Sequence, residues 1–572
     1  MKYNEKKTEL SEVGNEIQQF WKDNNIFEKS IDTREGKPTF TFYEGPPSAN
    51  GTPGIHHVMG RTVKDIFCRF KTMQGFQVKR KGGWDTHGLP VELQVEKELG
   101  ITKEDIGKKI SVEEYNKKCR ESVMKYKSEW DELTVKMGYW VDLEKPYITF
   151  ENNYIESVWH LLKQFHSQNL LYKGYTIQPY SPAAGTGLSS HELNQPGTYK
   201  DVRDTSAVAQ FKLKPNSKIQ VPNATEETYF IAWTTTPWTL PSNSALAVGE
   251  NIEYVLVSTF NPYTFLPIQV ILAKALMGKY FSDKAKDISL EEYTSGDKLI
   301  PFKLISSFKG KDLVGVEYEQ LMPYLQPDTA AFRVIAGDFV STEDGTGIVH
   351  IAPTFGADDA RVAKQAGIPS IVTKDDRGNE YPLVDRQGRF TKEVTDFAGE
   401  YVKEAYLTDE EKEVERNKQG RDKYLSVDER ISIKLKEANR AFKVERYEHS
   451  YPHCWRTDKP VLYYPLDSWF IKTTAKKDRL VELNKSINWK PESTGTGRFG
   501  NWLENLVDWN LSRSRYWGTP LPIWRTEDGS EEKCIGSIEE LKAEIAKAQK
   551  AGIETATEIN DLHSPYVDNI VL

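Results

Sequence analysis

One segment near the start of the chain combines a strand, a turn rich in Gly and Pro, and a long helix. Pro38–Tyr43 is rich in Thr and Phe and predicts a strand, and the turn at 45–51 follows it. A helix is predicted over 57–71, and Phe76–Lys79 predicts a second strand. The apolar stripe of this helix consists of Met59, Val63, Ile66, Phe67 and Phe70. This order is typical of the start of a parallel α/β sheet.

The residue pattern of the sequence changes at about residue 200, from helical to β-like. Short β-like runs separated by turn residues predict a mainly β-barrel module inserted into the α/β domain. The runs are 206–213, 228–233, 254–259, 269–272 and 347–351, and charged helical patterns follow at 408–418 and 427–439. We therefore expect N-terminal helices and the first half of a Rossmann-like domain in 1–199, and the insertion in 200–445. A return stem, the start of the second half and a connective insertion follow in 446–572.

Composition favours a cytoplasmic protein with packed domains. The chain has 572 residues and a net charge of −8, and its four cysteines lie far apart without a CxxC pair. Residues 1–7 lack the apolar core of a signal peptide. The most apolar stretch, 267–277, is too short for a membrane span and contains Lys274. The basic run Lys79–Lys81 has two open interpretations, a local contact for RNA or a solvated turn.

Gly54, His56 and His57 stand where the turn meets the predicted helix. A helix N-terminus carries free N–H groups and a partial positive charge, which suits phosphate. Imidazoles placed there can donate hydrogen bonds to phosphate oxygens as negative charge develops. Glycine allows a flat base to approach the backbone. Two adjacent histidines alone are more often ordinary surface or core residues.

The context of these residues resembles a known family. The run Phe42–His57 resembles the HIGH-motif region of class I aminoacyl-tRNA synthetases, in which the motif usually reads His-x-Gly-His. Here the first and third positions are exchanged. The resemblance implies that Gly54, His56 and His57 serve catalysis, with ATP and Mg²⁺ as the substrate complex. The exchange leaves open which histidine contacts which phosphate.

Two further motifs resemble the isoleucyl branch of this family. Gly83–Glu92 looks like the isoleucyl signature, because the leucyl branch typically carries Phe where His87 stands. The resemblance implies that Asp85 binds the ammonium group of isoleucine and that His87 lies in the same substrate site; a turn-capping role for Asp85 remains open. Residues 508–522 are similar to a segment of the second catalytic half. Pro46 and Trp517 are candidates for the isoleucine side-chain pocket, and Trp517 fits a plain core position equally well.

Such an enzyme needs a second, hydrolytic site. One methylene contributes only about 1–3 kcal/mol of discrimination, a value established with isoleucyl enzymes themselves, so valine is misactivated. Trp233–Asn243 resembles the threonine-rich editing motif of the family, and Gly345–Asp359 resembles its second editing motif. A threonine run alone is usually only a strand. The implied editing residues are Thr234, Thr235, Thr236, Asn243, His350 and Asp359, with Asp359 as the anchor for the α-ammonium of the mischarged valine.

Some expected parts of such an enzyme are missing from the sequence. Relatives often carry a four-cysteine zinc site, but here only Cys454 of the matching positions remains, so we expect no zinc in this chain. The KMSKS loop and the anticodon-binding domain are absent as well. The resemblance implies a fragment of a monomeric ligase that acts on tRNA(Ile) without a membrane partner. We expect it to edit valine but not to complete aminoacylation.

Three other classes fit parts of the pattern. A free-standing editing hydrolase would not need the residue 54–57 turn or the residue 84–92 signature. A nucleotidyl-transferring enzyme of the same α/β superfamily would lack the large insertion. A non-catalytic RNA-binding relative would be expected to have lost Asp85 and Asp359, and both are present.

Overall fold

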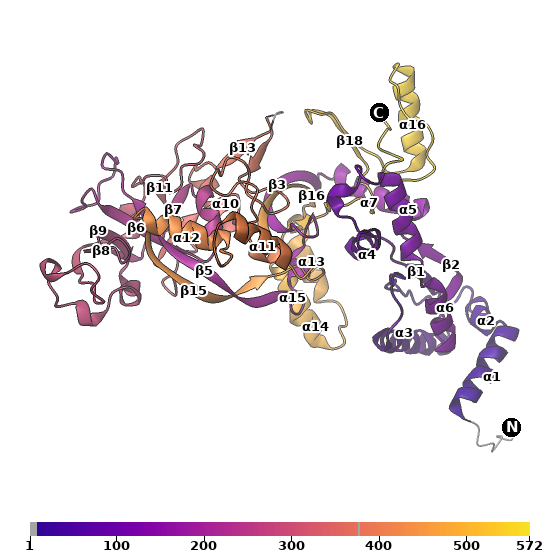
Figure 1. Cartoon of the computed structure of the whole chain (residues 1–572). Helices are drawn as coiled ribbons and strands as arrows, with labels where there is room; N and C mark the ends of the chain where they lie inside the picture. Colours follow the sequence, from indigo (N-terminus) through magenta and orange to yellow (C-terminus); the bar gives the residue numbers. More distant parts are fainter. Residues whose placement is uncertain (1–8, 376–377) are drawn as a thin grey trace. The chain divides into compact units, whose positions relative to one another are not determined.

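The structure, a computed structural model, describes residues 9–375 and 378–572, and the signal-peptide prediction for residues 1–7 lies outside these ranges. The chain divides into two compact units (Figure 1). The first unit comprises residues 1–172, 471–509 and 515–572. The second comprises residues 173–470 and 510–514. This second unit is wider than the expected insertion, 200–445, because strands on both flanks of that range pack within it.

The first unit is mainly helical. Its longer helices are α1 (Leu10–Asp23), α2 (Ile26–Asp32), α3 (Ile55–Met73), α4 (Leu89–Leu99), α5 (Val112–Val123), α6 (Lys127–Lys136), α7 (Asn152–Ser167), α13 (Lys477–Asn484), α15 (Arg498–Glu504) and α16 (Ile538–Lys550). The helix predicted over 57–71 is therefore present as α3. It begins after Gly54, whose extended backbone ends the Gly- and Pro-rich turn.

The strands of the first unit differ from the prediction. The predicted strands Pro38–Tyr43 and Phe76–Lys79 are wrong as regular strands, because they meet only in one parallel bridge, Thr39–Gln77. The regular pair is β1 (Lys81–Trp84) with β2 (Asp142–Ile148), which run parallel. Strand β2 lies between helices α6 and α7, where Pro146 cannot continue a helix.

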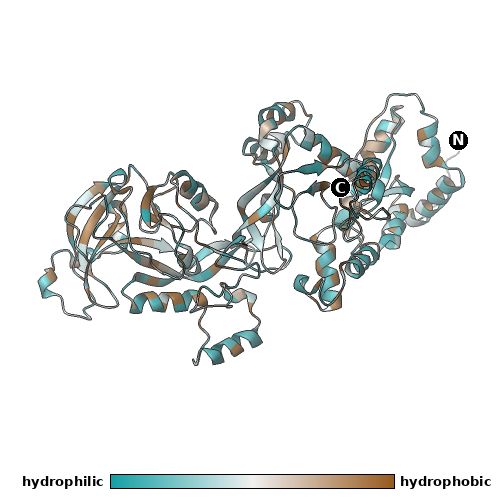
Figure 2. Ribbon diagram, turned by 90° about the horizontal axis from the view of Figure 1, so that it is seen from above, coloured by the Kyte–Doolittle hydropathy of each residue, from teal (hydrophilic) through white to brown (hydrophobic). Residues whose placement is uncertain are grey.

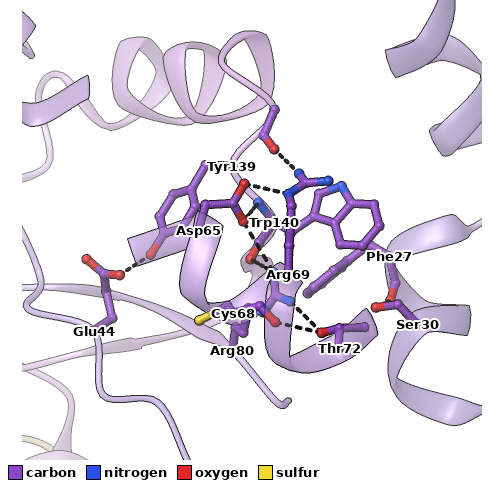
Figure 3. Close-up of polar contacts among 11 residues, drawn as sticks. Phe27, Ser30, Glu44, Asp65, Cys68, Arg69, Thr72, Arg80, Tyr139 and Trp140 are labelled. Carbon is purple, nitrogen blue, oxygen red and sulfur yellow. Dashed lines mark hydrogen bonds and ion pairs between the residues drawn. The ribbon is translucent and has the colours of Figure 1, made fainter. Parts of the chain in front are cut away.

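Helix α3 presents opposite chemistry on its two sides. Arg61, Cys68 and Thr72 are buried, whereas every member of its predicted apolar stripe is more than half exposed within the described residues. The buried side carries the polar network of Figure 3. There Asp65 pairs with Arg69 at 2.6 Å and with Arg80 at 3.3 Å, and Arg80 also donates to the Thr72 hydroxyl. Arg80 is only 2% exposed. Its burial excludes this member of the basic run from a surface patch for RNA.

The second unit is built on a mixed sheet that contains nine strands in the described residues. Its strands are β5 (Tyr199–Lys212), β6 (Thr228–Thr234), β7 (Ala245–Val248), β8 (Glu253–Phe260), β9 (Pro267–Ala273), β10 (Lys303–Lys309), β11 (Arg333–Ala336), β12 (Ile348–Ile351) and β15 (Ala441–Pro452). All five β-like runs predicted from the sequence are confirmed as strands. The two predicted helical segments are also confirmed, as α11 (Asp409–Lys418) and α12 (Val427–Glu437).

Strand β6 is the branching point of this sheet. It pairs with β5 in antiparallel and with β9 and β12 in parallel. The isolated bridges Leu213–Tyr318 and Glu317–Arg333 connect the end of β5 with β11. Apolar strand residues form the core of the unit, including Phe211, Phe230 and Leu256. Figure 2 shows this concentration of hydrophobic residues in the strands.

A second, smaller sheet flanks the long strands. It contains β3 (Leu171–Ser181), β4 (Thr186–Gly187), β16 (Leu462–Ile471) and β17 (Trp509–Asn510).

The four cysteines, Cys68, Cys119, Cys454 and Cys534, are all buried free thiols. No helix among the described residues is long and apolar enough to cross a membrane.

Candidate functional site

The first unit contains a cavity of about 510 Å³ at the start of α3. The turn before the helix supplies one wall, with Pro46 among its residues, and His56 and His57 supply another. Trp130 of α6 closes part of the cavity. The proposed phosphate-site residues His56 and His57 and the proposed substrate residue Pro46 therefore share one cavity, and Gly54 begins the helix beside them.

The geometry fixes the proton position on His57. Its Nδ1 accepts a hydrogen bond from the Gly54 backbone N–H at 2.9 Å. The proton of the neutral ring must then lie on Nε2. Burial, followed by the charges of His56 and Arg61, lowers the pKa of His57. The ring also packs edge-on against Trp130 at 4.7 Å. At Gly54, an added Cβ would lie 2.9 Å from the His56 ring, so a larger residue there would require the His56 side chain to shift.

The sequence prediction missed the charged residues of this cavity. Glu44 and Lys64 form an ion pair at 2.8 Å, and both line the cavity. The Tyr139 hydroxyl donates to Glu44 (Figure 3). Arg61 lies over the Trp130 ring at 4.9 Å. A glutamate in a turn and a basic residue on the first turns of a helix carry no distinctive spacing, so only the fold could join them.

Asp85, His87 and Trp517 lie together at the end of β1. The exposed Asp85 carboxylate accepts the backbone N–H of His87. The His87 ring lies 5.1 Å from Trp517, which is 1% exposed and packs with Val91 and Tyr115 in a core cluster. None of these three residues lines the 510 Å³ cavity. The backbone N–H of Asp85 does bond to the Pro47 carbonyl of the turn at 2.9 Å.

His87 belongs to a chain of two imidazoles and a carboxylate. Its Nε2 lies 2.8 Å from Nε2 of His563, whose Nδ1 lies 2.5 Å from Asp561. The carboxylate accepts the Nδ1 proton of His563, so a neutral His563 ring accepts the Nε2 proton of His87. The His563 ring also stacks on Trp517 at 4.7 Å with a 7° interplanar angle. This chain fixes the orientation of His87 in the signature motif.

We predict that His87 stays neutral in mildly acidic solution. Burial is the largest cause that lowers its pKa from 6.5 to about 3, followed by the electrostatic influence of His563 and Arg120. The unfolded chain therefore binds more protons over this range, and this contribution to stability falls as pH drops from 6.5 towards 3. Nitrogen-15 NMR of the His87 ring should report one neutral tautomer, protonated at Nε2, at pH 5. A titration midpoint near the ordinary histidine value would contradict this.

Glu92 connects the signature motif to the segment at 515–517. It is fully buried and pairs with Arg515 at 2.5 Å through one carboxylate oxygen. The other oxygen accepts the backbone N–H groups of Tyr516 and Trp517 at 3.0 and 2.9 Å. Glu96, one turn later on α4, also pairs with Arg515. A single carboxylate thus holds two motifs that are more than 400 residues apart.

The second unit contains a cavity of about 460 Å³ lined by both predicted editing motifs. Val349 of β12 pairs in parallel with Trp233 of β6, so the two strands end at the same edge of the sheet. The predicted residues that line the cavity are Thr234, Thr235, Thr236, His350 and Asp359. A Gly-Thr-Gly turn also lines the cavity, and in it Gly345 and Gly347 adopt positive φ angles of 69° and 74°.

Asp359 lies at the start of helix α10 (Ala357–Gln365). One carboxylate oxygen accepts the Ala352 backbone N–H at 2.8 Å. Burial, and to a smaller extent the charge of Asp358, raises the pKa of Asp359 to about 6. Among the described residues, no Lys or Arg ion pair to Asp359 occurs, whereas Asp358 pairs with Arg361. The carboxylate therefore remains available for a cationic group that enters the cavity.

His350 is held from both sides of its ring. The Thr239 hydroxyl lies 2.8 Å from Nε2, and the Asn243 amide nitrogen lies 3.0 Å from Nδ1. Asn243 accepts a hydrogen bond from the buried Tyr318 hydroxyl at 2.8 Å. Burial lowers the pKa of His350 to about 4, so the ring is neutral at pH 7. Asn243 itself does not line the cavity, and its contacts orient His350 instead.

The comparison with protein-family models decides the family. The model described as tRNA synthetases class I (I, L, M and V) matches residues 16–568. The chain belongs to this family. The motifs found at 42–57, 83–92 and 508–522 thus lie within a class I tRNA synthetase domain.

Relatives of this synthetase chain are closely similar. An isoleucine–tRNA ligase of Cytophaga hutchinsonii is 90% identical over 572 residues, covering 100% of this chain and 51% of that protein. An isoleucine–tRNA ligase of Bacteroides fragilis is 60% identical over 600 residues, covering 99% of this chain and 51% of that protein. The chain thus spans about half the length of the curated relatives it matches. A solved LeuRS–tRNA–LeuAMS complex of Agrobacterium radiobacter K84 is 14% identical with a TM-score of 0.32, covering 91% of this chain and 51% of that one.

The side chains of the synthetase chain fit some ligands better than others. Across residues 9–375 and 378–572, no group of three or more His, Cys, Asp or Glu side chains is arranged to hold a metal ion. The helix start with two imidazoles and Lys64 offers donors for phosphate oxygens. The threonine cavity offers hydroxyl groups, a neutral imidazole and an unpaired carboxylate, which suit an ester with a nearby ammonium group.

Proposed function

We propose that the second unit hydrolyses valyl-tRNA(Ile), and that the first unit contributes to ATP-dependent activation of isoleucine. The observation that carries the hydrolytic part is the single 460 Å³ cavity that Asp359 shares with the threonines of 234–236. We infer that the sheet around it curls into the barrel expected from the sequence. The bridges from Leu213 to Tyr318 and from Glu317 to Arg333 support this closure.

The cavity residues divide the work of ester hydrolysis. Asp359 binds the α-ammonium group of the misattached amino acid, because an ionised carboxylate is the strongest protein acceptor for a cationic donor. The hydroxyls of Thr234, Thr235 and Thr236 hold the terminal ribose and the attacking water. His350 stays neutral at pH 7. Because Thr239 and Asn243 fix its ring, it presents a constant dipole to the substrate in the cavity. The wall at 345–347 limits the space for the amino-acid side chain, so that the larger isoleucine is excluded.

Activation is assigned to the 510 Å³ cavity of the first unit. In this cavity, His56, His57 and Lys64 would hold the ATP phosphates. Asp85 lies outside its lining, where its backbone N–H bonds to the Pro47 carbonyl of the turn, and would hold the ammonium group of isoleucine. Mg²⁺ bound to ATP would neutralise phosphate charge. Pro46, at the cavity, and Trp517, behind His87, are proposed to border the isoleucine side chain. His87 and its imidazole partner keep that border in a fixed geometry.

The proposal is tested by deacylation kinetics with matched substrates. The chain should release valine from valyl-tRNA(Ile) at least about tenfold faster than isoleucine from isoleucyl-tRNA(Ile), which one excluded methylene can produce. Equal rates for the two substrates would overturn the assignment. Isoleucine-dependent pyrophosphate exchange, measured in the same preparation, reports separately on the first unit, where we expect little or no exchange.

The rate of valine release should rise with pH around the pKa of Asp359. The raised pKa of about 6 means that the carboxyl is largely protonated, and unable to bind an ammonium ion, below that pH. We expect kcat/KM to be about tenfold lower at pH 5 than at pH 7, after subtraction of spontaneous hydrolysis. A stopped-time assay across this range checks the result. A flat profile for the wild-type chain would contradict it. Asp358→Asn should keep the rise of rate with pH, with its midpoint at slightly lower pH, because the charge of Asp358 contributes to the raised pKa of Asp359.

A further inference from the structure

The short helix η2 (Pro237–Ser242) begins directly at the threonine cavity, and Thr236 precedes its first residue. A threonine at this position usually accepts a hydrogen bond from a backbone N–H two or three residues later. The Thr236 side chain makes no such bond. Its hydroxyl lies 3.3 Å from the Thr234 hydroxyl, in the wall of the cavity. The capping group of η2 therefore comes from elsewhere.

Asp428 supplies this capping group. Its Oδ1 accepts the Trp238 backbone N–H at 2.8 Å, although the two residues are 190 positions apart. Pro237 has no N–H, and the Thr239 N–H bonds to the Thr236 carbonyl at 2.9 Å. The Trp238 N–H is thus the group that a local cap would have satisfied. With Asp428 in place, the Thr236 hydroxyl is not needed for this bond.

A buried ion cluster fixes the Asp428 carboxylate. Lys403 Nζ lies 3.9 Å from its Oδ2 and 2.6 Å from Oδ2 of Asp204 on β5. His449 reaches the same Asp204 oxygen at 3.3 Å, and the Lys403 ammonium lies over the Tyr451 ring. Asp428 and Lys403 are each only 6% exposed. Buried charges need such partners, so the carboxylate has little freedom to leave its position.

Asp428 is not required to cap its own helix. It is the second residue of α12, whose N-terminal cap is Ser426. The Ser426 hydroxyl accepts the Glu429 N–H at 3.3 Å, and the Glu429 carboxylate accepts the Ser426 N–H at 2.8 Å. This reciprocal pair is a complete capping box. The contact from Asp428 to Trp238 therefore serves η2.

We propose that Asp428 is a positioning residue for hydrolysis in the threonine cavity. By accepting the Trp238 N–H, it releases the Thr236 hydroxyl from a capping role and leaves it facing the cavity. Without an acceptor at position 428, the Thr236 side chain turns to cap Trp238 and is withdrawn from the substrate. This inference rests on the hydrolytic function proposed above, but the side-chain rearrangement itself does not depend on any substrate.

The kinetic test uses Asp428→Ala with two companions. Asp428→Asn keeps an oxygen that can accept the Trp238 N–H, and Ser426→Ala weakens the α12 cap without touching Trp238. For valyl-tRNA(Ile), we expect Asp428→Ala to lower kcat about tenfold with little change in KM, the size expected for one misplaced polar group. Asp428→Asn should recover most of the rate, and Ser426→Ala should resemble the wild type. An equal loss in Ser426→Ala and Asp428→Ala would overturn the proposal.

A double-mutant cycle separates positioning from general destabilisation. If Asp428 acts through Thr236, Asp428→Ala has no further effect on kcat in a Thr236→Val background. An undiminished effect in that background would show that Asp428 acts by another route. Should Asp428→Ala fail to fold, Asp428→Leu keeps the branching at Cγ, leaves no cavity and likewise lacks an acceptor oxygen.

A crystal structure of the Asp428 variant decides the question without activity. We expect the Thr236 hydroxyl within hydrogen-bond distance of the Trp238 backbone nitrogen. An unchanged Thr236 side chain would refute the proposal, whatever the kinetics. If the wild-type chain and Asp359→Ala release valine at the same rate, the proposed hydrolytic function fails instead. The two failures are therefore distinguishable.

Discussion

Asp359→Ala is expected to abolish the hydrolysis of valyl-tRNA(Ile) by this chain. The carboxylate is the cavity group best suited to an α-ammonium ion, and it is available because no Lys or Arg among the described residues pairs with it. Losing about 3 kcal/mol of charge-assisted hydrogen bonding lowers kcat/KM by at least about 100-fold. Single-turnover deacylation with excess enzyme measures the effect.

The neighbouring aspartate provides a matched control. Asp358 is exposed and pairs with Arg361, so Asp358→Ala should leave the rate within about twofold of the wild type. Asp359 also accepts the Ala352 N–H, and Asp359→Asn keeps an acceptor for that bond while removing the charge. Asp359→Asn should therefore fold normally and still be inactive. Undiminished valine release by Asp359→Ala would show that the assignment is wrong.

Glu92→Ala is expected to destabilise the first unit by about 3–5 kcal/mol, because it leaves the buried Arg515 guanidinium with an incomplete set of partners. The variant also deprives the N–H groups of Tyr516 and Trp517 of their acceptor. Hydrogen exchange of residues 515–520, read by mass spectrometry, should become much faster. Thermal unfolding followed by tryptophan fluorescence should show an earlier transition.

Glu98 on the same helix is the control for this substitution. Its side chain is exposed, so Glu98→Ala should change the unfolding temperature little. An equally small effect of Glu92→Ala would mean that the contact between residues 92 and 515–517 does not organise the unit. The second unit, which contains neither residue, should keep its own exchange pattern in both variants.

The sequence predicts a segment of the fold correctly where the residue pattern of that segment agrees with its burial in the folded protein. The runs that became β5, β6, β8, β9 and β12 were found because continuous apolar segments bounded by turns are strands when both faces are buried. Strand β2 was not predicted because it is only partly buried and contains Pro146. Helix α3 was found from its apolar stripe, yet that stripe is exposed and the buried side carries Arg61 and Thr72. Periodicity predicts a helix, but it does not tell which side is covered.

The residues of the candidate site were also predicted only in part. The resemblance identified residues 234–236, 350 and 359, and parallel pairing of β6 with β12 explains why they meet in one cavity. The supporting residues had no recognisable signal. Glu92 and Asp428 act through contacts to backbone N–H groups 424 and 190 positions away, respectively. The spacing of residues in the sequence does not indicate such contacts. His563 likewise joins His87 from 476 positions away.

The central claim is that the threonine cavity admits valine and excludes isoleucine. Calorimetric titration of the chain with non-hydrolysable valyl-adenosine and isoleucyl-adenosine analogues tests it most directly. We predict that the valyl analogue binds at least about tenfold more tightly, corresponding to about 1.4 kcal/mol, and that Asp359→Ala loses this binding. Equal affinity for the two analogues, or equal affinity in Asp359→Ala, would contradict the account.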